Sequence, residues 1–138
     1  MMAQRPGNVV VAGAAYWAIV FAVGFALGTL RVLLVEPALG KLPAVLIELP
    51  VMLGASWLAA RWLVRRLAIA LARRALAMGG IAFAMLMASE AVLTIAMPGN
   101  SPDQWLADMA TPAGFIGLSG QLAFALFPWL VRSADGRD

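Results

Sequence analysis

The sequence predicts an all-α integral membrane protein, a bundle of four transmembrane helices with a short interfacial helix in its outer loop. Hydrophobic residues make up 63% of the 138-residue chain and charged residues only 12%, whereas soluble domains are about 45–50% apolar and about 25% charged. The mean hydropathy is +0.89. No water-facing surface could carry this excess of apolar residues, so we expect residues 1–138 to form a single transmembrane domain in the cell inner membrane.

The residue types exclude several kinds of chemistry. The chain contains no His and no Cys, which are the usual ligands of zinc, copper, haem and iron–sulfur centres. We therefore expect no metal site and no cofactor, and nothing in the sequence supplies the nucleophile of an enzyme. The net charge of +3 and the pI of about 10.6 do not indicate nucleic acid binding, because the arginines lie beside apolar stretches, as on the cytoplasmic face of membrane proteins.

Four apolar stretches each come near the roughly 20 residues that a bilayer-crossing helix needs. They cover about residues 9–35, 43–64, 75–97 and 112–131. We expect the first span to stop at Glu36-Pro37, because proline cannot continue a helix. The second should begin at Pro43 and kink at Pro50. The first stretch is longer than the roughly 7–15 apolar residues of a signal-peptide core, so we expect it to remain as a span.

The basic residues predict the orientation of the spans. Five arginines and no acid lie at the connection between the second and third spans, and the positive-inside rule places such a connection in the cytoplasm. Both termini, with Arg5, Arg132 and Arg137, are then cytoplasmic too. We expect the five arginines to contact anionic lipid, with docking of a partner protein as the open alternative. The five are Arg61, Arg65, Arg66, Arg73 and Arg74.

The outer loop contains one readable helix signal. Ser101 precedes Gln104 by the three residues of a capping box, and Pro102 occupies the favoured first helical position. Trp105 then falls on the apolar face of the predicted helix, together with Leu106 and Met109. We expect this segment to lie along the outer membrane interface, with the tryptophan at the level of the lipid headgroups.

Each span contributes one strongly polar residue to a similar depth. Arg31, Glu48 and Glu90 lie roughly 8–12 Å below the outer ends of their helices at about 1.5 Å per residue, and Gln121 lies slightly deeper. Charged side chains in the bilayer are costly and mark functional sites by default. We expect Glu48 and Glu90 to form a proton or cation site, Arg31 to supply the counter-charge and Gln121 to line the site. In the alternative, structural interpretation, Arg31 and Glu48 fix the helix register as an ion pair, and Glu90 pairs with Gln121.

Small residues share helix faces with these polar groups. Gly24 and Gly28 form a GxxxG pattern on the face of Arg31, and Gly114 and Gly117 share a stripe with Gln121. Small residues allow helices to approach closely in lipid. The pattern therefore predicts that the polar groups point into the bundle.

The favoured function is a transporter or permeation protein for a cation or small solute, acting as a homo-oligomer such as a dimer. The alternative is an accessory or assembly subunit of a larger membrane complex, with the polar residues serving helix packing. In length and four-span layout the chain resembles the small multidrug exporters, which work as dimers around a Glu in the first helix. Here the first span carries Arg31 in its membrane part and Glu36 only at its end, so no functional residue is carried over from that family.

Overall fold

The computed structural model describes residues 6–69, 71–96 and 99–134. Within these ranges every secondary-structure element is a helix and no β-strand is present. The helices are, in order, α1 (Pro6–Leu30), the π-helix η1 (Arg31–Val35), α2 (Glu36–Leu39), α3 (Lys41–Arg66), α4 (Ala72–Ala96), α5 (Pro102–Met109) and α6 (Pro112–Ala134). Arg5, Arg137 and the end of the third predicted span at residues 97–98 lie outside the described residues.

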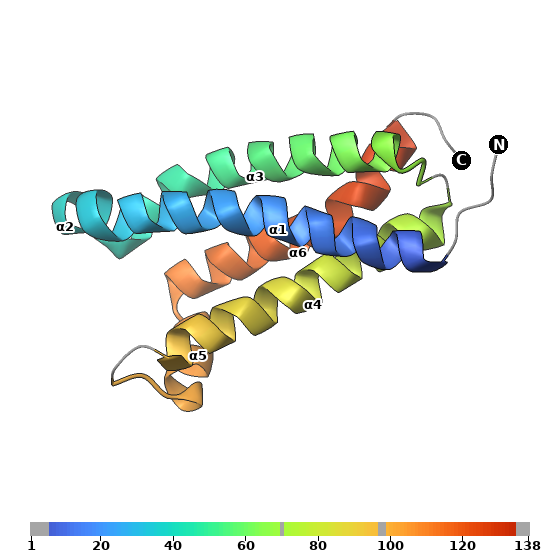
Figure 1. The fold of residues 1–138 in the computed structure, drawn as a ribbon. Coiled ribbons are helices and arrows are strands. Elements are labelled where there is room, and N and C mark those ends of the chain that lie inside the picture. Colours follow the sequence, from blue (N-terminus) through green and yellow to red (C-terminus); the bar gives the residue numbers. More distant parts are fainter. Residues whose placement is uncertain (1–5, 70, 97–98, 135–138) are drawn as a thin grey trace.

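Four helical stretches are long and apolar enough to cross a membrane. They are the continuous stretch Val9–Leu39, and the stretches Lys41–Arg66, Ala72–Ala96 and Pro112–Ser133. The predicted all-α class with four long apolar helices is therefore confirmed. The start of α1, the end of α6 and the adjoining ends of α3 and α4 lie at one end of the molecule (Figure 1), which we call the Arg-rich end. The opposite end, formed by α2 and α5, is called the loop end.

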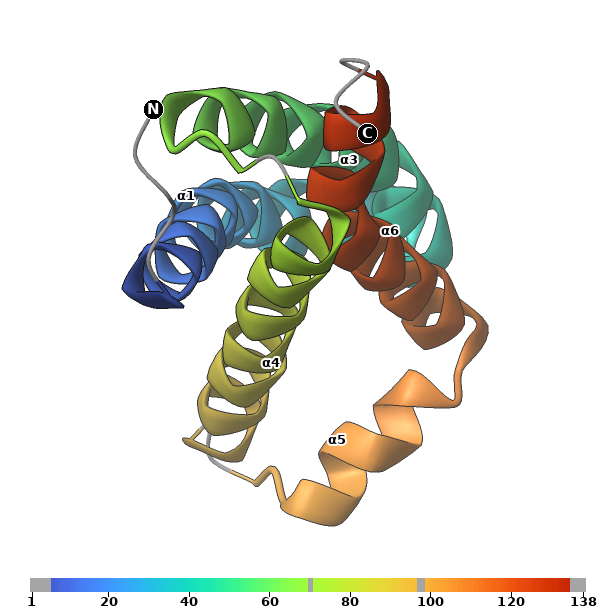
Figure 2. The same ribbon diagram turned by 90° about the vertical axis from the view of Figure 1, so that its right-hand side faces the viewer.

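The long helices pack in a ring. Helix α1 contacts α3 and α4, and α6 contacts the same two helices. The order around the bundle is therefore α1, α3, α6, α4 (Figure 2). Toward the loop end α4 diverges from α1 and α3 (Figure 1), and α5 lies between the ends of α4 and α6 (Figure 2).

The buried core is concentrated near the Arg-rich end. Tyr16 of α1 is fully buried, stacks on Phe124 of α6 with 4.2 Å between ring centroids, and donates a 2.6 Å hydrogen bond to the Phe124 carbonyl oxygen. In an α-helix this carbonyl would accept from the N–H four residues later, but that residue is Pro128, which has none. The tyrosine hydroxyl thus supplies the donor that the proline removes. The other core members are Ala12, Val20, Ala59, Ala60, Leu63, Val64, Ile69, Ala75, Met78, Ala82, Leu86 and Val131.

One glycine permits a close approach of α4 and α6. A Cβ atom added to Gly79 of α4 would collide with the backbone of Ala125 on α6. The neighbouring Gly80 faces open space and is exposed. The α4–α6 contact therefore depends on the absence of a side chain at position 79.

The first span does not stop at Glu36-Pro37, and the expectation that it would is wrong. The chain instead widens into the π-helix η1, in which the Glu36 N–H bonds to the Arg31 carbonyl five residues earlier. Pro37 then occupies the first turn of α2, a position at which helices tolerate proline. The helical path continues to Leu39 and ends at Gly40, whose φ of 90° favours glycine.

The predicted loop helix is present as α5. Ser101 accepts a 3.2 Å hydrogen bond from the Gln104 N–H, as the capping pattern predicts. At the other end of α5, the Thr111 hydroxyl donates to the Asp108 carbonyl at 2.7 Å and accepts from the Gly114 N–H at 3.0 Å. These bonds tie α5 to the first turn of α6.

Candidate functional site

Arg31 bridges two carboxylates near the loop end of the bundle. Its Nη1 lies 2.5 Å from Glu36 Oε2, and its Nε lies 2.5 Å from Glu48 Oε2 on α3. The side chains of Arg31, Glu36 and Glu48 are 24%, 23% and 18% exposed. The predicted contact between Arg31 and Glu48 is therefore present. Arg31 also contacts Glu36, which the sequence analysis placed only at the end of the first span.

The π-helix explains why Glu36 joins this contact. At about 100° per residue, an α-helix would turn residues 31 and 36 roughly 140° apart around the axis. The wider turn of η1 brings the N–H of Glu36 onto the carbonyl of Arg31 and so places the two side chains on one face. Single π turns inside α-helices occur frequently at functional sites.

Glu90 and Gln121 form a second pair, between α4 and α6. The Gln121 Nε2 amide donates to both carboxylate oxygens of Glu90, at 2.6 and 2.7 Å. Both side chains are half-buried. The structure thus brings together the two residues that the sequence placed at the same depth on the third and fourth spans.

The two pairs belong to one electrostatic cluster. Glu90 lies close enough to Arg31 and Glu48 to interact with the charge of each. We call the set Arg31, Glu36, Glu48, Glu90 and Gln121 the polar cluster. One guanidinium there faces three carboxylates, so the cluster carries two negative charges in excess when every group is ionised. Within the described residues, no three acidic side chains converge on a point that could hold a metal ion.

The polar cluster lies beyond the packed core. Phe124 and Leu86 are the buried residues of α6 and α4 nearest to it, one turn toward the Arg-rich end. No residue of η1 or α2 is buried. The polar cluster thus lies on the loop-end side of the buried core.

The four glycines of the predicted packing faces differ in their surroundings. Gly24 lies beside the Met52 side chain of α3, and Gly28 beside the guanidinium of Arg31 on its own helix stretch. Gly114 packs against the backbone of α5, and the space beside Gly117 is open. None of these four therefore forms the close contact between two long helices that Gly79 makes.

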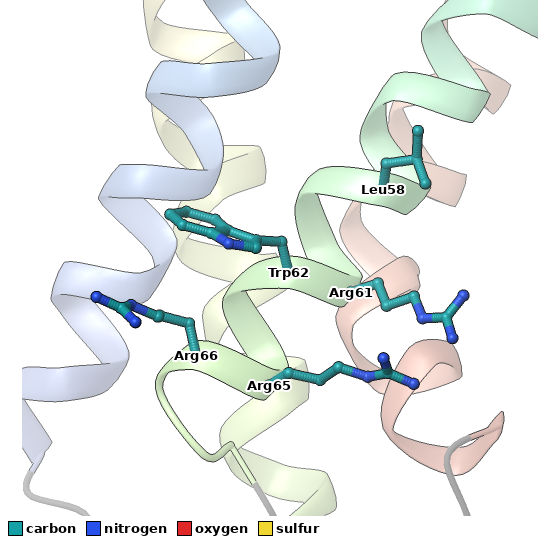
Figure 3. A pocket seen from close by; sticks show the side chains of 5 residues that line it. All are labelled: Leu58, Arg61, Trp62, Arg65 and Arg66. Atoms are coloured by element: carbon teal, nitrogen blue, oxygen red, sulfur yellow. The ribbon is translucent and has the colours of Figure 1, made fainter.

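The arginines of the Arg-rich end differ in their exposure. Arg61, Arg65 and Arg66 are exposed on the last turns of α3. Arg73 is exposed and Arg74 half-buried at the start of α4, whereas Arg132 of α6 is only 6% exposed. The α3 arginines line a surface hollow with two apolar residues of the same helix (Figure 3).

Sequence reasoning missed two features of the site region. Glu36 belongs to the polar cluster because of the π turn η1, and the spacing of residues in the sequence does not predict such a turn. The support of α6 by Tyr16 could have been found, because Pro128 leaves one carbonyl of the fourth span without a donor and Tyr16 is the only tyrosine of the chain. Comparison with protein-family models, with curated proteins and with solved structures found no match to this chain.

Proposed function

We propose that this chain is a small multi-pass membrane transporter or permeation protein that conducts protons, or a small cationic solute in exchange for protons, through its polar cluster. The observation that supports the proposal most is the excess of three carboxylates over one guanidinium on helices long enough to span a bilayer. A charge at the bilayer centre costs at least about 2.5–3.5 kcal/mol on insertion scales. A carboxylate inside the membrane avoids this cost when it binds a proton or a cation. Carboxylates of this kind form proton relays and cation sites.

The partners of the carboxylates suggest different roles for them. Arg31 contacts both Glu36 and Glu48, so these two carboxylates have a cationic partner within the bundle. Glu90 is held by the neutral amide of Gln121. An amide donates to a carboxylate through its N–H groups and accepts from a carboxylic acid through its oxygen. Glu90 can therefore keep a hydrogen-bonded partner in both protonation states, and it is the member that we propose exchanges protons.

The proposed orientation follows the positive-inside rule. The Arg-rich end, with the two termini, faces the cytoplasm, and the loop end faces the outside. The polar cluster then lies in the outer part of the membrane, within reach of the outer aqueous phase. A proton taken up by Glu90 from that side must next pass the apolar core near Tyr16, so the proposal requires an opening motion or water entry there.

A second candidate function is suggested by the partners of the polar cluster. Each of its five residues has a hydrogen-bond or ion-pair partner within the bundle. Polar contacts between helices stabilise membrane bundles, so the cluster could serve packing alone, in an accessory subunit of a larger membrane complex. In that case removal of the Glu90 carboxylate changes stability but no flux.

Proton flux into proteoliposomes distinguishes the two candidates. Purified protein is reconstituted with an entrapped pH-sensitive dye, and a potassium diffusion potential drives protons inward. We expect flux above that of empty liposomes for the wild type, loss of that flux in Glu90→Gln, and retention of it in Asp103→Asn. The control removes one carboxylate from the exposed surface of α5, outside the polar cluster. Undiminished flux in Glu90→Gln would contradict the proposal, and wild-type flux equal to that of empty liposomes would contradict proton conduction.

A further inference from the structure

The last two turns of α3 carry a hollow with mixed chemistry. Leu58, Arg61, Trp62, Arg65 and Arg66 line it (Figure 3), and its volume is about 430 Å³. It is open to the surroundings of the bundle. Leu58 is 65% exposed and Trp62 57% exposed. Two apolar side chains and three guanidinium groups therefore share one accessible surface on a single helix.

The side chains form two ridges with the hollow between them. Trp62 and Arg66, four residues apart, project on the side of α1, whereas Arg61 and Arg65 project on the side of α6 (Figure 3). Leu58 lies toward the middle of the helix, about 12 Å from the level of Arg66 at about 1.5 Å per residue. The apolar part of the hollow is thus the deeper part along the span, and the cationic part is at the end of the helix.

The sequence around this surface is cationic. No acidic residue occurs between Glu48 and Glu90. Guanidinium groups bind phosphate oxygens through two parallel N–H bonds, and tryptophan favours the level of the lipid headgroups. Leu58 is the deepest of the five lining residues along α3, and the arginines follow it to the end of the helix. The hollow is therefore apolar toward the middle of the span and cationic at its end, as an anionic phospholipid is from acyl chain to headgroup.

We infer that the hollow on α3 is a binding site for one anionic phospholipid. Arg61 and Arg66 attract its anionic headgroup from either side of the hollow, Trp62 lies beside the glycerol region, and Leu58 contacts an acyl chain. A soluble phosphate would satisfy the arginines but leave Leu58 and Trp62 without a partner. The site is distinct from the polar cluster, and the inference does not depend on the proposed transport function.

Lipid titration monitored by native mass spectrometry tests this site. The protein in detergent is titrated with phosphatidylglycerol or with phosphatidylcholine, and the first bound lipid is quantified. We expect a preference of at least tenfold for phosphatidylglycerol. Arg61→Gln and Arg66→Gln should each weaken that first binding about fivefold, in line with the contribution of one basic residue near an anionic lipid. Trp62→Ala should weaken it as well.

The matched control is Arg73→Gln, which removes an exposed arginine of the same end that does not line the hollow. We expect it to leave the first lipid affinity within twofold of the wild type. An equal loss in Arg73→Gln would show diffuse attraction and overturn the site, and so would equal binding of both lipids. Competition by millimolar inorganic phosphate with no effect of Trp62→Ala would identify a soluble anion instead. Thermal melts in phosphatidylcholine show whether each variant is folded.

Discussion

The hydroxyl of Tyr16 donates to the carbonyl oxygen of Phe124 across the buried core, at 2.6 Å. This bond joins the first and last membrane-length helices and occupies the acceptor left open by Pro128. A buried acceptor without a donor costs about 1–3 kcal/mol. The contact is therefore a specific support of the α6 helix, and its energetic dependence on the proline can be measured.

We expect Tyr16→Phe to lower the free energy of unfolding by about 1–3 kcal/mol, because it keeps the ring stacking and leaves the Phe124 carbonyl without a donor. In a Pro128→Ala background the helix supplies its own N–H, so the same change should cost less. Thermal and chemical unfolding in detergent, arranged as a double-mutant cycle, gives both values. An identical cost of Tyr16→Phe in the two backgrounds would contradict the explanation.

The α4–α6 approach gives a second prediction with a matched pair of variants. Gly79→Ala should destabilise the protein by about 1–3 kcal/mol, because the added methyl group collides with the backbone of Ala125. Gly80→Ala should be neutral or stabilise by up to about 1 kcal/mol, since its side chain enters open space in a helix. The two melting temperatures are compared in one detergent. A loss at position 80 equal to that at position 79 would exclude the close helix contact as the cause.

The bridge made by Arg31 predicts unequal effects of removing its members. Arg31→Met leaves two carboxylates without their cation, and by comparison with buried pairs in soluble proteins it should cost about 3–5 kcal/mol. Glu48→Gln should cost less, because Arg31 retains Glu36. The double variant should be more stable than the sum of the two single losses implies. Unfolding of the three variants tests this cycle, and strictly additive losses would contradict a direct interaction.

The orientation can be tested with single cysteines, because the native chain has none. Asn100→Cys lies at the loop end and Arg66→Cys at the Arg-rich end. With an impermeant thiol reagent added to intact cells, we expect labelling at position 100 and none at position 66 until the cells are opened. The reverse pattern would invert the proposed orientation and place the polar cluster near the cytoplasm.

The sequence was sufficient for the helical architecture because composition and span length decide it. The Ser101 cap and the two polar pairs also followed from spacing, since helices of similar length that run antiparallel place residues of equal depth side by side. The end of the first span did not follow. Pro37 was expected to stop the helix, but the π turn η1 precedes it and the proline lies in the first turn of α2, where helices tolerate it.

The helix contacts themselves were less accessible to sequence reasoning. The GxxxG pattern at Gly24 and Gly28 indicates a surface that permits close approach, but the neighbouring helix decides whether the approach is made. Gly79 makes it, within a Gly-Gly pair that has no GxxxG spacing. The same limitation applies to Glu36, whose position relative to Arg31 depends on local backbone geometry and on no side-chain pattern.

Proton exchange by Glu90 is the step on which the proposed function depends, and infrared difference spectroscopy observes it without any assumption about substrate. Protein reconstituted in lipid is taken between acidic and alkaline pH, and the carboxylic acid C=O band is recorded in light and heavy water. We expect a band that forms on acidification in the wild type and in Asp103→Asn, and that is missing in Glu90→Gln. A Glu90→Gln spectrum identical to that of the wild type would show that Glu90 does not exchange protons.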